Sequence, residues 1–121
     1  MASILTVDDS ASIRQAIKIA LSSEGFNVIE ACDGAEGLTK AAAGGVSLII
    51  TDLNMPVMNG LTMVRRLRAQ PAYAGLPILF LTTESDTELK AQAKAAGATG
   101  WITKPFVPDK LVQVVKKVLA T

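Results

Sequence analysis

The sequence of 121 residues contains no histidine, and this absence removes several kinds of chemistry at once. Histidine is the usual general base in proteins and the most common ligand of transition metals. A chain without it also cannot carry a phosphohistidine of its own. A functional site in this protein must therefore be built from carboxylate, hydroxyl and ammonium groups.

Cysteine and long apolar runs are also scarce. The single Cys32 cannot form an internal disulfide, and its apolar neighbours predict a small buried side chain and not a reactive thiol. No 18 apolar residues follow one another, and the first residues lack the cationic stretch and apolar run of an export signal. We therefore expect neither export nor membrane insertion, and a location in the reducing cytoplasm.

An excess of charge of one sign is missing as well. Lys and Arg number 12 and Asp and Glu 11, which leaves a formal net charge of +1. No general field would draw such a protein to nucleic acid or to an acidic membrane surface. A direct nucleic-acid or membrane partner is therefore not expected.

What the sequence does contain is an alternation of two hydrophobic patterns. Half of the residues are apolar, which is enough for one core in a chain of this length. Short apolar runs predict five strands, and the longer stretches with helical spacing predict helices after them. The strands are predicted over residues 4–7, 26–29, 48–50, 78–81 and 100–102.

Capping signals indicate where the helices begin and end. The first helix has an apolar stripe over residues 13–21, with Ser12 and Gln15 spaced as a capping box and Gly25 as a stop. The other helices are predicted over residues 35–43 and 61–70, from a Ser85 and Glu88 capping box to Gly97, and from Pro108 onward.

Strict alternation of strand and helix indicates the fold class. Short connections between such elements predict an α/β protein, with a doubly wound five-stranded parallel sheet and helices on both faces. We expect a single domain over residues 1–121. Because the sequence stops at Thr121, just after the last predicted helix, we expect no further domain.

Polar side chains stand at the ends of four of the five predicted strands, where ligands bind in a doubly wound sheet. Asp8 and Asp9 end the first strand, Asp52 follows the third, Thr82 ends the fourth and Lys104 follows the fifth. Each has an ordinary structural reading when taken alone, as a solvated strand end, a turn residue or a surface charge. Together they point to a site, because three like-charged carboxylates repel one another unless a cation lies between them.

These groups suit phosphoryl transfer. Mg2+ binds carboxylate oxygens together with water and phosphoryl oxygens, and Asp8, Asp9 and Asp52 offer such carboxylates. The reaction needs an in-line nucleophile, for which Asp52 is the candidate, and positive charge on the phosphoryl oxygens. Lys104 would pair with one phosphoryl oxygen, and the Thr82 hydroxyl would donate to another. The hydrogen bond from Thr82 would exist only after phosphorylation, so it could convert a chemical event into a conformational one.

Five motifs resemble, in identity, order and spacing, the receiver domains of response regulators. They are Val7-Asp8-Asp9-Ser10, Thr51-Asp52-Leu53-Asn54-Met55-Pro56, Asn59-Gly60, Leu81-Thr82-Thr83 and Lys104-Pro105-Phe106. The resemblance covers nearly the whole chain and is strongest to the stand-alone chemotaxis regulators of the CheY type. It implies a flavodoxin-like, CheY-like sheet with strand order 2-1-3-4-5.

The resemblance also implies roles for the acidic residues. Asp52 would be the phospho-acceptor. Mg2+ would be held by Asp9, Asp52 and the main-chain carbonyl of Asn54, with Asp8 acting through water.

Further roles follow at the ends of the last two strands. Thr82 is similar to the switch hydroxyl of the family, Lys104 to its phosphoryl-pairing lysine, and Pro105 to a proline that usually follows a cis bond. Trp101 departs from the pattern, because the family usually carries Tyr or Phe there, in a ring that turns inward on activation. The larger indole would either stay at the surface as part of a docking face or simply pack at the sheet edge.

The resemblance implies two partners, a histidine kinase of the chemotaxis type as phosphodonor and a docking partner such as the flagellar motor switch. It also implies a monomer that catalyses only its own phosphorylation and dephosphorylation and is not an enzyme acting on other substrates. A phosphate sink or a phosphorelay intermediate would use the same residues and is the alternative. Two other classes fit less well. A phosphohydrolase needs a cap and a second acid, and a dinucleotide-binding module needs a glycine-rich turn where this chain has Asp8-Asp9-Ser10.

Overall fold

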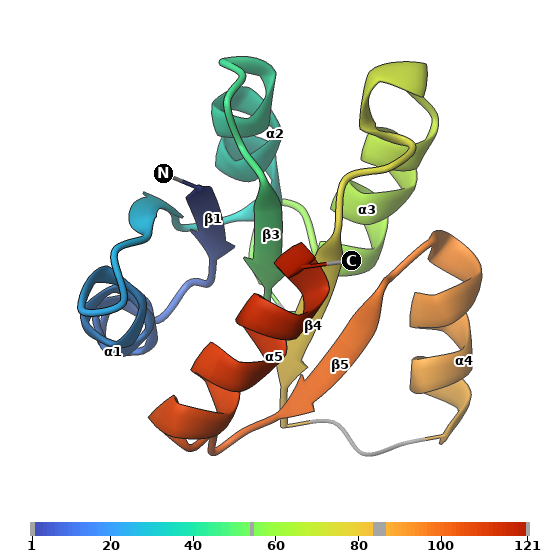
Figure 1. The fold of residues 1–121 in the computed structure, drawn as a ribbon. Helices are drawn as coiled ribbons and strands as arrows, with labels where there is room; N and C mark the ends of the chain where they lie inside the picture. Colours follow the sequence, from blue (N-terminus) through green and yellow to red (C-terminus); the bar gives the residue numbers. More distant parts are fainter. Residues whose placement is uncertain (1, 54, 84–86, 121) are drawn as a thin grey trace.

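The computed structural model describes residues 2–53, 55–83 and 87–120, in which five strands alternate with five α-helices (Figure 1). The strands are β1 Ser3–Val7, β2 Asn27–Ala31, β3 Leu48–Thr51, β4 Ile78–Thr82 and β5 Gly100–Thr103. The helices are α1 Ala11–Ser22, α2 Gly34–Ala42, α3 Gly60–Arg68, α4 Thr87–Ala96 and α5 Pro108–Ala120, with a short 3-10 helix at Pro71–Tyr73. The predicted strands and helices are therefore present, with bounds that differ by one or two residues.

The strands form one parallel sheet in the order β2-β1-β3-β4-β5, which confirms the predicted fold class and strand order. β1 lies between β2 and β3, and its last residue Val7 is opposite Ala31 on one side and Thr51 on the other. The strand order reverses between β1 and β3, and the residues that follow these two strands meet at one edge of the sheet (Figure 1).

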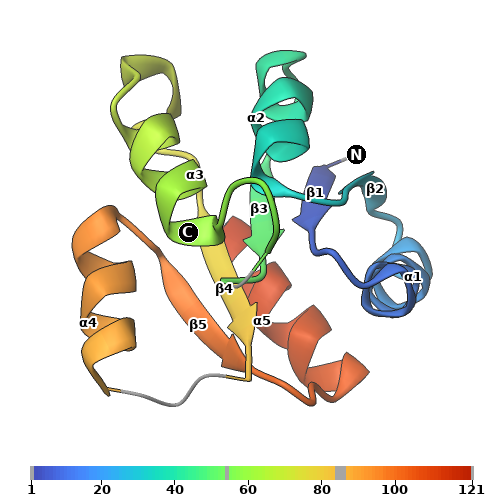
Figure 2. The same ribbon diagram turned by 180° about the vertical axis from the view of Figure 1, so that it is seen from behind.

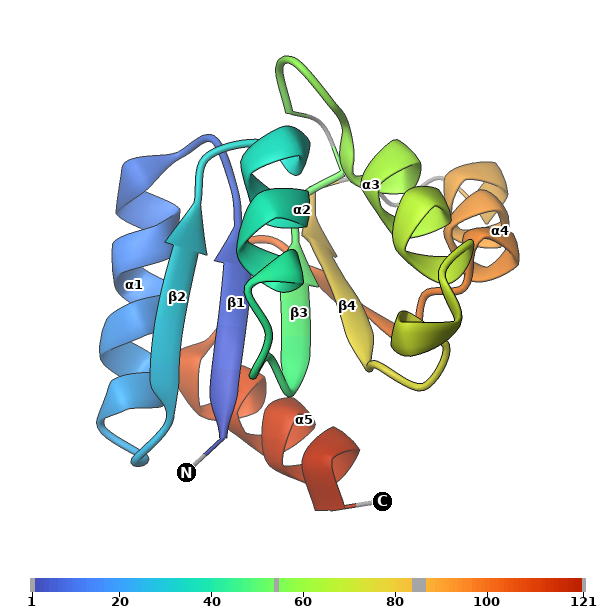
Figure 3. The same ribbon diagram turned by 90° about the horizontal axis from the view of Figure 1, so that it is seen from above.

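Helices cover both faces of the sheet. Figure 1 shows α5 in front of the sheet, and Figure 2 shows α3 and α4 in front of it from the opposite side. Seen from above in Figure 3, α1 and α5 lie on one side of the strands and α2, α3 and α4 on the other. Buried side chains form one cluster with each helix group, as expected for a sheet whose strands are buried on both faces.

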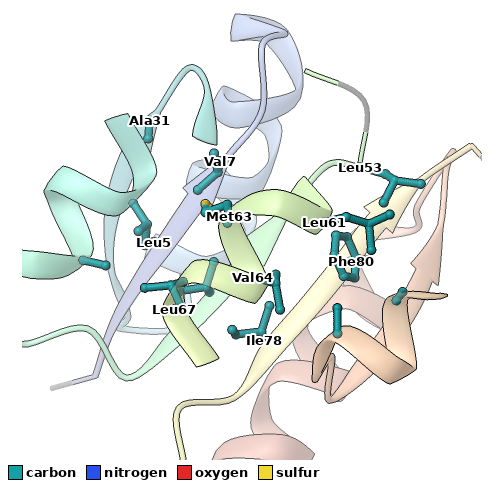
Figure 4. Close-up of a cluster of buried hydrophobic side chains, with 14 residues drawn as sticks. Leu5, Val7, Ala31, Leu53, Leu61, Met63, Val64, Leu67, Ile78 and Phe80 are labelled. Atoms are coloured by element: carbon teal, nitrogen blue, oxygen red, sulfur yellow. The ribbon is translucent and has the colours of Figure 1, made fainter. Parts of the chain in front are cut away.

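Successive side chains along each strand point to opposite faces of the sheet and so contribute to the two clusters in turn. Leu5 and Val7 of β1 pack toward α2 and α3 (Figure 4), whereas Ile4 packs with α1 and α5. Phe80 of β4 is fully buried in the first of these clusters, and Leu79 and Leu81 belong to the second. The central strands are thus packed from both sides, and the polar residues that follow them are carried on a buried layer.

The start of α1 differs from the prediction. Its N-cap is Ser10, whose Oγ accepts a hydrogen bond from the Ile13 N–H at 3.4 Å, and Ser12 lies inside the helix. The capping box of Ser12 and Gln15 was therefore a wrong interpretation, because the serine two residues earlier caps the helix. The Ser85 and Glu88 capping box cannot be compared, since Ser85 lies outside the described residues.

Cys32 also differs from the prediction, because its side chain is exposed. It directly follows β2, and the buried position belongs to Ala31 at the end of that strand. Partial desolvation and the neighbouring Glu36 and Asp33 carboxylates raise the pKa of the thiol. The thiol is therefore exposed, and its raised pKa disfavours the thiolate form.

Two further expectations concern the backbone and the membrane. The peptide bond between Lys104 and Pro105 is cis, as the resemblance implied. Among the described residues, no helix is both long enough and apolar enough to cross a membrane.

Candidate functional site

Three carboxylates meet where β1 and β3 end. Asp8 and Asp9 follow β1, Asp52 follows β3, and one carboxylate oxygen of each lies within 4.8 Å of the others. Asp8 is 1% exposed and Asp52 8%, whereas Asp9 is exposed to solvent. Several carboxylate oxygens with an open side are the donor set that Mg2+ prefers, so the group fits this ion. Asn54, expected to add a main-chain carbonyl, lies outside the described residues.

Lys104 brings a positive charge to the carboxylates from the far end of the chain. Its Nζ lies 3.0 Å from Oδ2 of Asp8 and 3.3 Å from Oδ2 of Asp52. Its main-chain N–H donates to the carbonyl of Thr82 at 2.8 Å, which ties the segment after β5 to the end of β4. The structure therefore brings Lys104 together with two of the predicted acidic residues.

Burial raises the pKa of Asp52 above its usual value, and the charge of Asp8 adds to this effect. The Lys104 ammonium and the N–H of Leu53 act in the opposite direction without cancelling it. Burial alone would lower the pKa of Lys104, but its hydrogen bond to Asp8 and the charge of Asp52 raise it overall. The three grouped carboxylates thus have one ammonium, which contacts two of them, and this surplus of negative charge favours a further cation.

Thr82 and Trp101 occupy different parts of the neighbouring strands. Thr82 ends β4 and is 1% exposed, next to the segment that carries Lys104. Trp101 lies in β5, partly buried, with its ring centroid 6.0 Å from that of Phe80. Lys90 of α4 places its Nζ 5.6 Å from the Trp101 ring centroid. Trp101 therefore packs between the sheet and α4 and is not part of the acidic cluster.

Two main-chain contacts that the sequence analysis missed hold the acidic side chains. The N–H of Ser10 donates to Oδ1 of Asp8 at 2.9 Å, and the N–H of Leu53 donates to Oδ1 of Asp52 at 2.8 Å. The first was foreseeable, since an aspartate side chain often accepts a hydrogen bond from the backbone N–H two residues further along the chain. The second depends on how the chain turns after β3, for which the sequence carries no separate signal.

The chain belongs to the response regulator receiver domain family, whose model matches residues 4–116. Within that family it is of the CheY type. It is 40% identical over 120 residues to chemotaxis protein CheY1 of Helicobacter pylori, and the match covers 98% of this chain and 97% of that protein.

Solved structures show the same relationship. Chemotaxis protein CheY4 of Vibrio cholerae superposes with a TM-score of 0.93 at 47% identity, over 98% of each chain. The response regulator TrrA of Thermotoga maritima, solved in complex with Mg2+ and BeF, has a TM-score of 0.87 at 33% identity, over 98% of this chain and 99% of that one. The family assignment made from the motifs is confirmed, and it places the protein in two-component phosphoryl-accepting signalling.

Proposed function

We propose that this protein is a chemotaxis response regulator that is phosphorylated on Asp52 by a histidine kinase of the chemotaxis type, with Mg2+ bound. The observation that carries this proposal is the setting of the Asp52 carboxylate. It is nearly buried, lies 3.3 Å from the Lys104 ammonium and has Asp8 and Asp9 beside it. The protein would act in the cytoplasm as a monomer and would turn over only its own phosphoryl group.

In the proposed reaction, a carboxylate oxygen of Asp52 attacks the phosphorus of a phosphohistidine on the kinase. The O–P bond forms as the N–P bond breaks, and the imidazole leaves with the electron pair of that bond. Asp8, Asp9, Asp52 and the main-chain carbonyl of Asn54 would hold Mg2+. When bound, this ion supplies positive charge that lowers the repulsion between the nucleophile and the donor.

Lys104 and Thr82 would act on the product. After transfer, the Lys104 ammonium would exchange a carboxylate partner for a phosphoryl oxygen, and the Thr82 hydroxyl would donate to another phosphoryl oxygen. Support comes from the hydrogen bond between the main-chain N–H of Lys104 and the carbonyl of Thr82, which links the two residues through the backbone. A movement of Thr82 would therefore be felt in the segment after β5.

The signal would leave the protein through the region around Trp101. Trp101 of β5 is paired with Phe80 of β4, and Phe80 lies two residues before Thr82 in that strand. Because Trp101 is only partly buried, it can also contact a partner, and large aromatic residues often contribute strongly to the affinity of a docking surface. The partner proposed is a component of the flagellar motor switch.

The acceptor is tested by incubating the protein with acetyl phosphate and Mg2+ and measuring its intact mass. The wild type should gain one phosphoryl group, and Asp52→Asn none. Asp109→Asn is the matched control, because Asp109 is an exposed aspartate in the first turn of α5. Phosphorylation of Asp52→Asn at the wild-type rate would reject the assignment.

The switch is tested with Thr82→Ala and the control Thr82→Ser, which keeps the hydroxyl. Both should accept phosphate, but only Thr82→Ser should bind a motor switch component as tightly as the phosphorylated wild type. Equal affinities of all three would count against a switch hydroxyl. Failure of the phosphorylated wild type to bind the motor component would favour a phosphate sink or relay instead.

The role of Trp101 is tested by fluorescence, since it is the only tryptophan. A beryllofluoride mimic with Mg2+ should shift its emission beyond the change seen with Mg2+ alone. Trp101→Ala should weaken partner binding and leave Asp52 phosphorylation nearly intact. Identical spectra in all states, together with wild-type affinity for Trp101→Ala, would leave only a packing role.

A further inference from the structure

Arg14 of α1 reaches back over the start of its own helix to the segment that carries the acidic residues. Its Nη1 donates to the main-chain carbonyl of Asp8 at 2.6 Å. Its Nε donates to Oε1 of Glu30 in β2 at 3.2 Å. The side chain is 17% exposed, so this guanidinium is largely shielded from water while it bridges two elements.

The carbonyl that Arg14 holds belongs to the peptide unit between Asp8 and Asp9. A peptide unit is planar, so fixing the direction of its carbonyl also fixes the direction in which the chain enters Asp9. Asp8 has other restraints, because Ser10 and Lys104 each donate to one of its carboxylate oxygens. The Asp9 side chain is exposed, and its direction depends on the backbone that carries it.

We propose that Arg14 is a positioning residue of the acidic site, which sets the affinity for a divalent cation by holding the Asp8–Asp9 peptide unit. This inference rests on the proposed Mg2+ site. Glu30 fixes the other side of the guanidinium to β2. Glu30 is paired with Thr6 of β1, so both acceptors of Arg14 belong to neighbouring parts of the sheet. Arg14 uses two nitrogens of its planar guanidinium for these two acceptors, a geometry that a lysine side chain cannot reproduce.

A simple effect of charge predicts the opposite result. Removing a positive charge near three carboxylates should strengthen the binding of a cation, whereas loss of the carbonyl contact should weaken it. The sign of the change in Mg2+ affinity therefore separates the two explanations. Lys18 supplies a matched control, because its Nζ lies 3.8 Å from Oε2 of the same Glu30 and its side chain is 53% exposed.

The experiment measures Mg2+ binding by isothermal titration calorimetry, in wild type, Arg14→Met, Arg14→Lys and Lys18→Met. Partners of metal ligands commonly change metal affinity by 10- to 100-fold, so Arg14→Met should bind Mg2+ about tenfold more weakly. Arg14→Lys should fall between Arg14→Met and the wild type, and Lys18→Met should stay within about twofold of the wild type. The amide resonance of Asp9 should move in both Arg14 variants without Mg2+ and stay in place in Lys18→Met.

Urea unfolding in EDTA establishes that each variant is folded, and Arg14→Lys carries the test if Arg14→Met does not fold. Unchanged or tighter Mg2+ binding in the Arg14 variants, or an equal loss of affinity in Lys18→Met, would overturn the role of Arg14. The proposed Mg2+ site would then still stand. Absence of Mg2+ binding to the wild type would overturn the proposed metal site and this inference with it.

Discussion

Replacement of Gly60 by Ala tests how closely α3 approaches the acidic site. Gly60 is the first residue of α3, and a Cβ built on it would lie 2.2 Å from the main-chain carbonyl oxygen of Asp52 and 2.8 Å from Cε1 of Phe80. Its N–H donates to the carbonyl of Leu53 at 2.9 Å, which holds the helix start against this segment. Gly60 has no positive φ, so the expected effect of the substitution is one of space alone.

The size of the effect follows from these contacts. Contacts of a Cβ shorter than 3.0 Å essentially never occur in proteins. For the distance between the new Cβ and the Asp52 carbonyl oxygen to reach 3.0 Å, that oxygen would have to move away by 0.8 Å. Phe80 is fully buried and cannot move aside freely. Overpacking a core costs about 1–3 kcal/mol, and because main chain must move we expect about 3 kcal/mol. In a chain of this length that loss lowers Tm by roughly 10 °C.

Urea unfolding and calorimetry in EDTA measure this loss, and a Mg2+ titration should show weaker binding because Asp52 moves with its carbonyl. Gly75→Ala is the control, since a Cβ there meets nothing within 4 Å, and its stability should change by less than about 0.5 kcal/mol. If Gly60→Ala is as stable as Gly75→Ala, the close approach does not constrain the site and the argument is wrong.

Three further predictions concern stability. Thr6 Oγ1 is buried with no hydrogen-bond partner in the described part of the chain, so Thr6→Val should raise the free energy of unfolding by about 1 kcal/mol in a urea titration; a loss would show that the hydroxyl is satisfied. Asp33 caps α2 by accepting from the Glu36 N–H at 2.8 Å, and Asp33→Ala should lower the same quantity by about 1 kcal/mol, a result that an unchanged midpoint would contradict. Because the pKa of Asp52 is raised in the folded state, the ionised carboxylate lowers the free energy of unfolding. This loss of stability is complete above the folded-state pKa and disappears as the pH falls through that pKa toward 3.8. In EDTA, Asp52→Asn should therefore be more stable than wild type at pH 7 and lose this advantage near pH 3, whereas an equal gap at both pH values would refute the sign.

The order of strands and helices, and the residues at the strand ends, could be read from the sequence because both depend on local patterns. Apolar runs predict buried strands, and parallel strands bring their carboxyl ends to one edge wherever the helices pack. Asp8, Asp9 and Asp52 could therefore be grouped from their places along the chain alone. The family resemblance then supplied the strand order, which the alternation of elements leaves open.

Contacts between distant elements were decided only by the tertiary structure. Arg14 looks like an ordinary helix residue in the sequence, and only the packing of α1 beside β1 and β2 brings its guanidinium to the Asp8 carbonyl and to Glu30. The exposure of Cys32 likewise depends on where β2 ends. The sequence by itself determined which groups stand at the carboxyl edge of the sheet, because that follows from strand periodicity. Their angles and their supports follow from side chains that meet across the fold, and no local pattern encodes those distances.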